Sequence, residues 1–251
     1  MTWQRPEDVR EEEVAVHYVT ARDAPADLAG QMVAAMAAGT LALVAQEDAV
    51  LMSPQKANEN LYFAHRLFSS VMLAPGLYSS ANNASADPLF ASYPTNSYLD
   101  DLFWASTWLL RAGQFNLRAD NSSWYYTASR TLFDLAFQER DSMAVGVDYM
   151  NNVALVHAAT ITYDWAFHSA AQSWIWDWIC SGDVKYTTFG RAWHPESMML
   201  GDTAMAAAIA ATYVHGARGW DKAASNEHFM TGARPHSLLA QRRCGSLEGD
   251  E

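Results

Sequence analysis

The chain has 251 residues, of which 50% are apolar, enough to bury a sizeable core in one domain or two small ones. Its formal net charge of -12 disfavours contact with the phosphate backbone of a nucleic acid, so a nucleic-acid partner is not expected. Cys180 and Cys244 are too few for a disulfide framework or a cysteine zinc cluster, and no unbroken apolar run of about 18 residues predicts a membrane span.

The first predicted helix covers residues 27–46 and is rich in alanine. Asp23 or Asp27 is placed to cap its beginning. Gly30 and Gly39, together with the alanines, give this helix a thin surface that suits close packing against another helix.

A second helix is predicted over residues 56–72, because apolar residues recur there with the 3.6-residue period of an amphipathic helix. The residues on that face are Leu61, Ala64, Leu67, Phe68 and Val71. Residues 78–97 contain turn formers and two prolines, which predict a long surface loop. Long loops in compact domains are often functional.

Helical patterns continue through the middle of the chain. One begins near Leu99, and its apolar face is formed by Leu99, Leu102, Phe103, Ser106, Leu109 and Leu110. Asn121 is placed to cap the next helix, which runs to Phe137, and residues 149–179 are apolar nearly all round. After a loop over residues 182–193, an alanine-rich helix is predicted over residues 200–216, closed by its final glycine.

The chain shows no strand alternation and no βαβ signal, so the predicted class is all-α, built from helix pairs with functional loops at their ends. It also lacks the glycine-rich, Walker, HExxH and CxxC motifs, and no organic cofactor is expected. The eight histidines have no metal-like spacing. His65 and His157 lie within helix patterns and are expected to be structural.

The loop segments carry the more informative residues. "WQRPED" (3–8) sets an indole beside a cation and two acids, and "SYPTNSYLDD" (92–101) has two tyrosines and two adjacent acids before a helix. Carboxylates favour the positive end of a helix macrodipole, which explains one of those acids better than two. "KYTTFGRAW" (185–193) and "GARPHS" (232–237) add further aromatic, cationic and imidazole groups.

Taken in order, these segments resemble glycoside hydrolase family 9, the endoglucanases that cleave β-1,4-glucans. Residues 3–8 are similar to the family's W-G-R-P-E-D, and "SYPTNSYLDDLFWASTWLLRA" is similar to F-Y-x-S-x-S-G-Y-x-D-E-L-x-W-A-A-x-W-L-x-x-A. "LGDTAMAAA" resembles L-G-S-T-A-N-A-A, and "FMTGARPHS" resembles F-V-x-G…R-P-H-H-R. The resemblance covers about residues 1–238 as a partial catalytic domain, and residues 239–251 are expected to be a disordered tail.

The resemblance implies an (α/α)6-barrel of six inner and six outer helices, here as a partial barrel of helix pairs. Sugar rings stack on aromatic side chains along the open cleft of that fold, which accounts for 10 Trp and 11 Tyr in one chain. Tyr93, Arg191 and Trp193 are the substrate-binding residues that the resemblance implies, and a β-glucan is the implied partner.

Family 9 enzymes invert the anomeric carbon with an aspartate that activates water and a glutamate that protonates the leaving oxygen, about 6.5–9.5 Å apart. The base aspartates precede W-G-R-P-E-D and the acid glutamate follows R-P-H-H-R, so the chain as given is expected to lack both and not to hydrolyse cellulose. His236 matches the first histidine of R-P-H-H-R and is assigned to the catalytic site, although the motif's arginine is Leu238 here. Glu248 lies outside the family's context and is not assigned.

In many family members the S-G-Y-x-D-E segment and a later aspartate bind a structural calcium ion. The matching residues here are Asp100, Asp101 and Asp164, with Asn96 and Ser97 in place of Ser and Gly. A cation would offset the repulsion of two adjacent carboxylates and tie the long loop to the helix. The alternative is a solvated helix N-terminus without metal.

Two other functions stay open from the sequence, a non-catalytic glucan-binding remnant and another helical-barrel enzyme that acts on sugars. The resemblance implies an extracellular protein, although the chain as given begins without the apolar core of a signal peptide. Asn83 and Asn121 begin N-x-S triplets that would accept glycans in that compartment.

Overall fold

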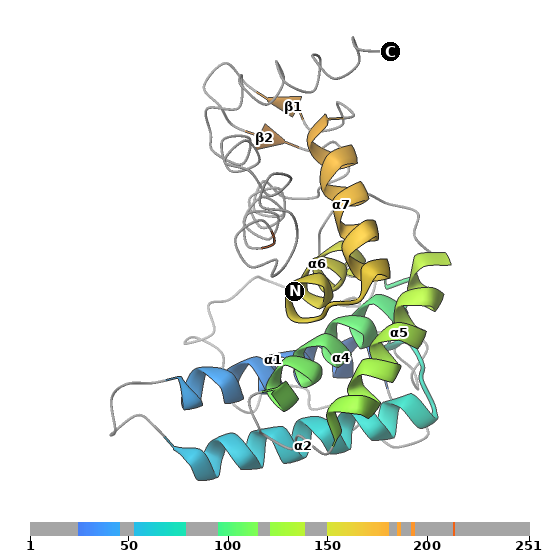
Figure 1. Cartoon of the computed structure of the whole chain (residues 1–251). Coiled ribbons are helices and arrows are strands. Elements are labelled where there is room, and N and C mark those ends of the chain that lie inside the picture. Colours follow the sequence, from blue (N-terminus) through green and yellow to red (C-terminus); the bar gives the residue numbers. More distant parts are fainter. Residues whose placement is uncertain are drawn as a thin grey trace, which may run out of the picture.

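Helices dominate the part of the chain that this computed structural model describes, which is residues 25–45, 53–78, 95–114, 121–138, 150–180, 185–186, 192–193 and 213. The elements are α1 (Ala26–Val44), α2 (Pro54–Leu73), α4 (Leu99–Gln114), α5 (Ser122–Gln138), α6 (Asn151–Ile161), α7 (Trp165–Cys180), β1 (Lys185–Tyr186) and β2 (Ala192–Trp193) (Figure 1). The predicted all-α class is confirmed.

The six helices follow one another as three pairs, α1 with α2, α4 with α5, and α6 with α7 (Figure 1). The first helices of the pairs are also neighbours, because α1 packs along α4 and α4 packs against α6. We call α1, α4 and α6 the inner helices and their partners the outer helices. This layering is the one expected for part of a barrel of helix pairs.

The inner helices α4 and α6 run in the same direction, because their beginnings meet and their ends meet. Asp100 at the start of α4 accepts a hydrogen bond from the backbone N–H of Met150, just before α6, at 2.9 Å. At the other end, the Gln114 side-chain amide donates to the carbonyl of Ile161, the last residue of α6, at 2.7 Å. We call the end at which the inner helices begin the N-terminal end.

The contact between α1 and α4 depends on a glycine near the start of α1. A Cβ atom on Gly30 would lie 2.7 Å from the backbone carbonyl carbon and oxygen of Asp101, closer than side-chain carbons approach other atoms. The neighbouring Gln31 side chain donates to the Asp101 carboxylate, so α1 and α4 also meet near their beginnings. The prediction that Gly30 allows close helix packing is confirmed, whereas Gly39 faces open space.

The core confirms the apolar faces predicted for two helices. On α2 the predicted Leu61, Ala64, Phe68 and Val71 are buried, and Leu67 is partly buried. On α4 Leu99 is partly buried, and the other residues of the predicted face are buried. These faces therefore supply much of the hydrophobic stabilisation of the described part.

An aromatic cluster joins three helices in the core. Phe103 of α4, Phe133 of α5 and Phe167 of α7 have ring centroids 5.2 to 6.0 Å apart, and all three side chains are buried. Rings at this separation gain from edge and offset contacts in addition to the burial of apolar area. The cluster thus fixes α7 against the α4–α5 pair.

The structure departs from the predicted elements at three places. The apolar stretch over residues 149–179 is interrupted at 162–164, so it forms two helices. Lys185 pairs with Trp193 in a two-residue antiparallel ladder, within the segment predicted to be a loop. Asp27 is the second residue of α1, after the N-cap Pro25, and its prediction as a cap is wrong.

α1 is the one helix among the described residues that is long and apolar enough to cross a membrane by length and composition. Helices in the core of soluble proteins share that property. Its contacts with α2 and α4 bury one face of α1, which includes Ala26, Ala29, Val33, Ala34 and Ala37.

Candidate functional site

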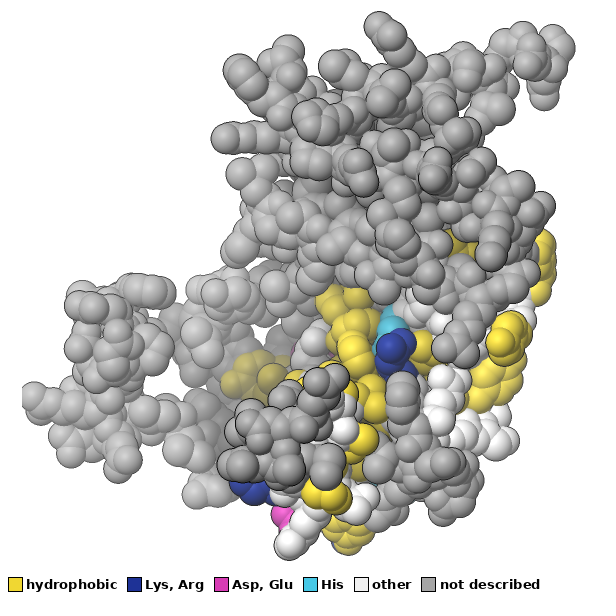
Figure 2. Space-filling model, turned by 60° about the vertical axis from the view of Figure 1, so that its left-hand side comes forward, with side chains coloured by type: hydrophobic (Ala, Val, Ile, Leu, Met, Phe, Trp, Pro, Cys, Tyr) yellow, Lys and Arg dark blue, Asp and Glu magenta, His cyan; other side chains and the backbone are white. Residues whose placement is uncertain are grey.

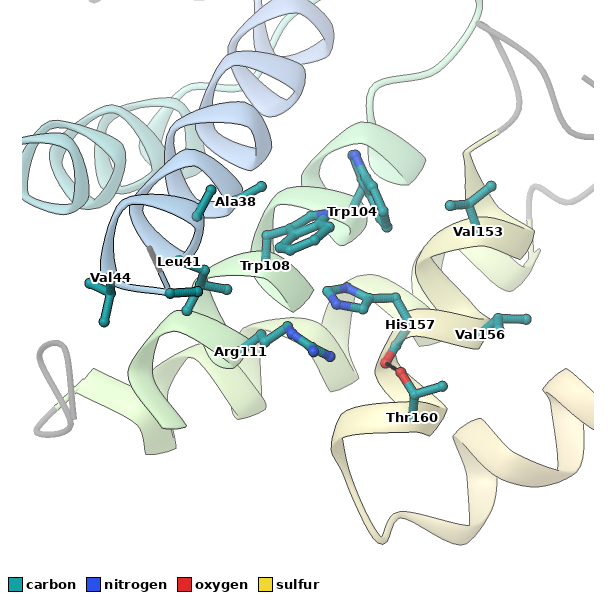
Figure 3. Close-up of a pocket in the computed structure, with 12 residues that line it drawn as sticks. Ala38, Leu41, Val44, Trp104, Trp108, Arg111, Val153, Val156, His157 and Thr160 are labelled. Carbon is teal, nitrogen blue, oxygen red and sulfur yellow. Dashed lines mark hydrogen bonds between the residues drawn. The ribbon is translucent and has the colours of Figure 1, made fainter. Parts of the chain in front are cut away.

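A cavity of about 670 Å³ opens on the face that the three inner helices share (Figure 3). Its lining consists of Ala38, Leu41, Ala42, Val44 and Ala45 at the end of α1, Trp104, Trp108 and Arg111 on α4, and Val153, Val156, His157 and Thr160 on α6. Small-molecule sites usually have about 300–1,000 Å³ and mostly apolar walls with a few polar groups. We call this cavity the inner-face pocket.

The space-filling view shows apolar side chains gathered on one face, with a histidine and a cationic side chain side by side among them (Figure 2). No carboxylate is present among the described residues that line the pocket. The pocket is therefore apolar with one cationic group, and it differs in character from the N-terminal end of the inner helices.

Two tryptophans form the aromatic wall of the pocket. Trp104 and Trp108 are four residues apart on α4, so they lie on the same face of the helix, and their rings meet edge to face at 5.4 Å. The Trp108 ring lies 4.3 Å from the imidazole of His157, tilted by 40°. Trp108, Arg111 and His157 point toward one another between α4 and α6 (Figure 3).

The hydrogen bonds around His157 fix the position of its proton. The Thr107 hydroxyl donates to the backbone carbonyl of Trp104 at 2.8 Å, so its oxygen is left to accept from Nδ1–H of His157 at 3.1 Å. In the neutral ring Nε2 then carries a lone pair. That nitrogen is buried and has no hydrogen-bond partner among the described residues.

Burial and, to a smaller extent, the positive charge of Arg111 lower the pKa of His157 to about 3. The ring is therefore neutral at physiological pH, and Nε2 is an acceptor rather than a donor. The prediction that His157 is structural accounts for its bond to Thr107 but not for the unpaired nitrogen.

A second group of polar side chains lies at the N-terminal end of the inner helices. Asp27 is buried, and both of its carboxylate oxygens accept from the backbone N–H of Tyr78 at 3.0 Å. One of these oxygens also accepts from the Thr95 hydroxyl at 2.7 Å. Asp27 thereby holds both ends of residues 79–94, the segment that contains the predicted substrate-binding Tyr93.

Asp100 and Asp101 begin α4 and are both buried. Their side chains point to different neighbours, because Asp100 accepts from the Met150 N–H before α6 and Asp101 accepts from Gln31 of α1. Both acids lie in the first turn of the helix, where the macrodipole favours negative charge. They therefore join α4 to both of the other inner helices.

Asp164 lies at the opposite end of α6 and is not a third ligand beside Asp100 and Asp101. Asp100 contacts the beginning of α6, whereas Asp164 follows its last residue, and the 11 residues between span about 16 Å. Calcium ligands lie about 2.3–2.6 Å from the ion, so one ion cannot join the three. Among the described residues no group of three or more His, Cys, Asp or Glu side chains could hold a metal ion.

The carboxylate of Asp164 has other partners. One oxygen accepts from the Ala166 N–H at 2.8 Å in the first turn of α7, and the other accepts from the Tyr126 hydroxyl at 2.7 Å and lies 3.3 Å from Nε of Arg130. The three-carboxylate calcium set is therefore corrected, and Asp164 caps α7. Calcium binding through Asp100 and Asp101 stays a prediction.

The other predicted site residues are not tested by the described structure. Tyr93, Arg191 and His236 lie outside the described residues. Trp193 lies in β2, opposite Lys185, and only its backbone is described. Their assignment to the substrate-binding and catalytic sites stays a prediction.

A pattern in the sequence indicates the inner-face pocket, although it was not part of the helix faces predicted from the sequence. Trp104, Trp108 and Arg111 recur at positions i, i+4 and i+7 of α4, beside the apolar face that includes Leu102 and Leu109. α4 thus carries a second stripe of large side chains beside its buried apolar face. Such a second stripe indicates a second contact surface. The helix is buried on one side and lines the pocket on the other.

Solved structures that share the fold include an endoglucanase and a cellulase. The structure resembles a termite endoglucanase from Nasutitermes takasagoensis with a TM-score of 0.66 and 22% identity, over 99% of this chain and 50% of that chain. It also resembles the cellulase Cel9M of C. cellulolyticum, with a TM-score of 0.59 and 22% identity, over 86% of this chain and 46% of the other. The predicted (α/α)6-barrel fold is confirmed, and the chain spans about half of each solved protein.

Plant endoglucanases are similar in sequence over part of the chain. Endoglucanase 15 of Arabidopsis thaliana is 35% identical over 111 residues, which are 44% of this chain and 20% of that protein. Endoglucanase 19 of Oryza sativa subsp. japonica is 31% identical over 112 residues, 45% of this chain and 20% of the relative. The matched part thus spans about a fifth of the length of these curated relatives.

The family assignment depends on a longer match. Residues 1–237 match the model of glycosyl hydrolase family 9, which is most of the chain and nearly the whole of the predicted catalytic part. The match removes the alternative of an unrelated helical-barrel enzyme. The chain belongs to glycosyl hydrolase family 9.

Proposed function

We propose that the protein acts on β-1,4-glucan as an endo-β-1,4-glucanase with inversion, in the breakdown of polysaccharides. The observation that carries this proposal is the family 9 match over residues 1–237 on a framework of inner and outer helix pairs. The printed names of similar proteins, endoglucanase and cellulase, support the same substrate class.

Inversion needs a base and an acid, two carboxylates separated by room for a water molecule. Three buried acids and the partly buried Asp164 serve the framework instead. Asp27 holds the ends of residues 79–94, Asp100 and Asp101 bridge the inner helices, and Asp164 caps α7. In this proposal the described part binds and positions the glucan, and none of these four acids is assigned as base or acid.

Binding and turnover can be measured separately. The purified chain should be retarded during native electrophoresis through a gel that contains soluble β-glucan, because a family 9 cleft with aromatic walls stacks on sugar rings. Bovine serum albumin in the same gel gives the control mobility. A chain that neither binds nor cleaves β-glucan would contradict the proposed function.

Release of reducing sugar from the same β-glucan tests whether the chain as given carries the catalytic carboxylates. Retardation without turnover is the result expected of a chain that binds glucan but lacks the base and the acid. Turnover would contradict the expectation that the chain as given lacks the base and the acid. If turnover occurs, proton spectra of the first product should show the α-anomer, as inversion of a β-linkage requires.

We also propose an extracellular location, as the family resemblance implies. Asn121, which directly precedes α5, would then be accessible at the beginning of a helix for a glycan. Secretion from a eukaryotic host followed by glycosidase treatment would test this, because loss of mass on treatment requires passage through the secretory pathway. A secreted chain of unmodified mass would contradict the use of this triplet.

A further inference from the structure

One face of α1 is apolar and points away from the helices that it contacts. α1 packs along α2 and α4, and these contacts bury the opposite face of the helix (Figure 1). Away from them, Leu28, Met32, Ala35 and Gly39 follow one another at positions i, i+4, i+7 and i+11, so they form one line along the helix. We call these four residues the outward stripe of α1.

The outward stripe is exposed and carries no charge. Leu28 is 44% exposed and Met32 is 51% exposed, Ala35 is exposed, and a Cβ atom on Gly39 would meet nothing within 4 Å. Residues 28–46 contain no charged side chain, although 18% of the whole chain is charged. A surface helix usually turns a polar face to water, and a helix that is apolar all round is usually buried. The outward stripe is therefore expected to pack against a further molecule.

The sizes of the stripe residues change in order along the helix. The two large side chains, Leu28 and Met32, come first, and the two small residues, Ala35 and Gly39, follow. Suppose that two copies of α1 pack antiparallel about a twofold axis. Leu28 then faces Gly39 of the second copy, and Met32 faces Ala35 of the second copy. Each large side chain fills the space beside a small one, so the stripe is complementary to itself, as the interface of a twofold dimer must be.

Other arrangements use the order of sizes less well. In a parallel pair of copies, Leu28 would meet Leu28 and Gly39 would meet Gly39, which crowds one end of the contact and leaves a gap at the other. Parallel macrodipoles also repel, whereas antiparallel ones attract. A lipid surface would favour large apolar side chains along the whole stripe and cations beside it, and residues 28–46 contain no Lys or Arg.

We propose that the outward stripe of α1 is the interface of a homodimer, in which α1 packs antiparallel against α1 of a second copy. The inference does not depend on the proposed glucanase function. With one helix from each copy, the contact is expected to be smaller than the roughly 800 Å² per partner of standard interfaces, so we expect a Kd of about 10 μM. The net charge of -12 on each copy opposes association at low salt.

The direct test is analytical ultracentrifugation of the unaltered chain. It should be mostly monomeric at about 1 μM and mostly dimeric at about 100 μM. Raising the salt concentration from about 0.05 M to about 0.5 M should favour the dimer, because screening weakens the repulsion between two acidic copies. A chain that stays monomeric at both protein concentrations and both salt concentrations would overturn the proposal and leave the stripe to another segment of a longer protein.

Two variants and their mixture test the antiparallel packing. Leu28→Glu and Gly39→Lys each put a charge on the exposed stripe, so each should fold but weaken self-association at least about tenfold, since the charge would be buried without a partner. In the antiparallel dimer, position 28 of one copy faces position 39 of the other. Mixing the two variants should therefore restore association to within about threefold of the unaltered chain.

The mixture also distinguishes the two directions of packing. Positions 28 and 39 are 11 residues apart, about 16 Å along a helix, so a parallel pair would keep the opposite charges apart. A mixture that associates no better than either variant alone would overturn the antiparallel dimer. A circular dichroism melt of each variant at about 1 μM checks that it folds as a monomer.

Phe63→Glu is the matched control. Phe63 is 59% exposed on α2, outside the outward stripe, so this change should leave self-association unchanged. Loss of the dimer in Phe63→Glu with a dimer retained in Leu28→Glu would place the interface on α2 and overturn the proposal.

Two further outcomes separate this inference from its rivals. A monomeric chain that sediments with phosphatidylcholine vesicles, an interaction lost in Leu28→Glu, would assign the stripe to lipid and overturn the homodimer. A chain that dimerises through the stripe but neither binds nor cleaves β-glucan would support the homodimer and contradict the proposed function.

Discussion

Gly30 of α1 lies against the backbone of Asp101 of α4, so closely that a methyl group at position 30 would lie 2.7 Å from the Asp101 carbonyl carbon and oxygen. The neighbouring atoms are main chain, which cannot rotate away as the end of a side chain can. The spacing of α1 and α4 at the N-terminal end is therefore set by the absence of a side chain.

Replacing this glycine should destabilise the fold. Gly30→Ala should lower the free energy of unfolding by about 1–3 kcal/mol, because α1 must move away from α4 to admit the methyl group. Gly39→Ala is a matched control in the same helix, where nothing lies within 4 Å of the added atom. It should raise the free energy of unfolding by about 0.5–1 kcal/mol, as alanine does in a helix interior. Urea denaturation measures both, and equal effects of the two changes would contradict the close approach.

The Asp27 carboxylate should be needed to hold residues 79–94 at their two ends. Asp27→Ala removes the acceptor for the Tyr78 N–H and the Thr95 hydroxyl and should cost about 1.5–3 kcal/mol of unfolding free energy. Thr95→Val removes one donor only and should cost less. Hydrogen exchange of the Tyr78 amide gives a local measurement, since that amide should exchange faster in Asp27→Ala than in Thr95→Val. Equal exchange rates would count against the carboxylate as its acceptor.

The neutral state of His157 predicts a pH dependence of stability. The folded pKa of about 3 lies below the ordinary value of 6.5, so the unfolded chain binds the extra proton between these two pH values. His157 should therefore make the free energy of unfolding fall as the pH decreases from 6.5 toward 3, by no more than about 1.4 kcal/mol per pH unit. His157→Gln should flatten the curve across this window, as measured by urea denaturation at each pH. Parallel curves for the two proteins would show that the ring protonates as easily in the fold as outside it.

Calcium binding at Asp100 and Asp101 has a test that also checks the correction for Asp164. Added calcium should raise the melting temperature and a chelator should reverse the rise, because a cation offsets the repulsion of the two carboxylates. Asp100→Asn with Asp101→Asn should abolish the rise. Asp164→Asn should keep the rise, although it weakens a helix cap and should itself cost about 0.5–2 kcal/mol. A melting temperature of the unaltered chain that neither calcium nor the chelator changes would contradict calcium binding.

The helices of this fold could be predicted because their buried faces repeat in the sequence. Leu61, Ala64, Phe68 and Val71 recur at helical spacing, and the structure buries them as the pattern requires. The break at residues 162–164 could not be read in the same way, because α6 is buried on most sides and has no polar stripe to mark its end. The two-residue strands were missed for a related reason, since two residues are too few to show alternation.

The candidate site was less predictable, because it depends on which faces of different helices meet. Trp104 and His157 are separated by 53 positions along the chain, and only the packing of α4 on α6 brings their rings within 5.4 Å. The resemblance to family motifs identified Asp100, Asp101 and Asp164 as residues of interest. It could not give their separation, which follows from the direction of α6 between them.

The hydrogen bond between Gln31 and Asp101 joins residues that are 70 positions apart, whereas each helix pair joins neighbours in the chain. Contacts that are local in sequence close small loops at low entropic cost, and contacts between distant residues close larger ones. The helix pairs are therefore expected to form early during folding, and the seam between α1 and α4 is expected to close late. Because Gly30 lies in that seam, this glycine is expected to affect how slowly the finished protein opens.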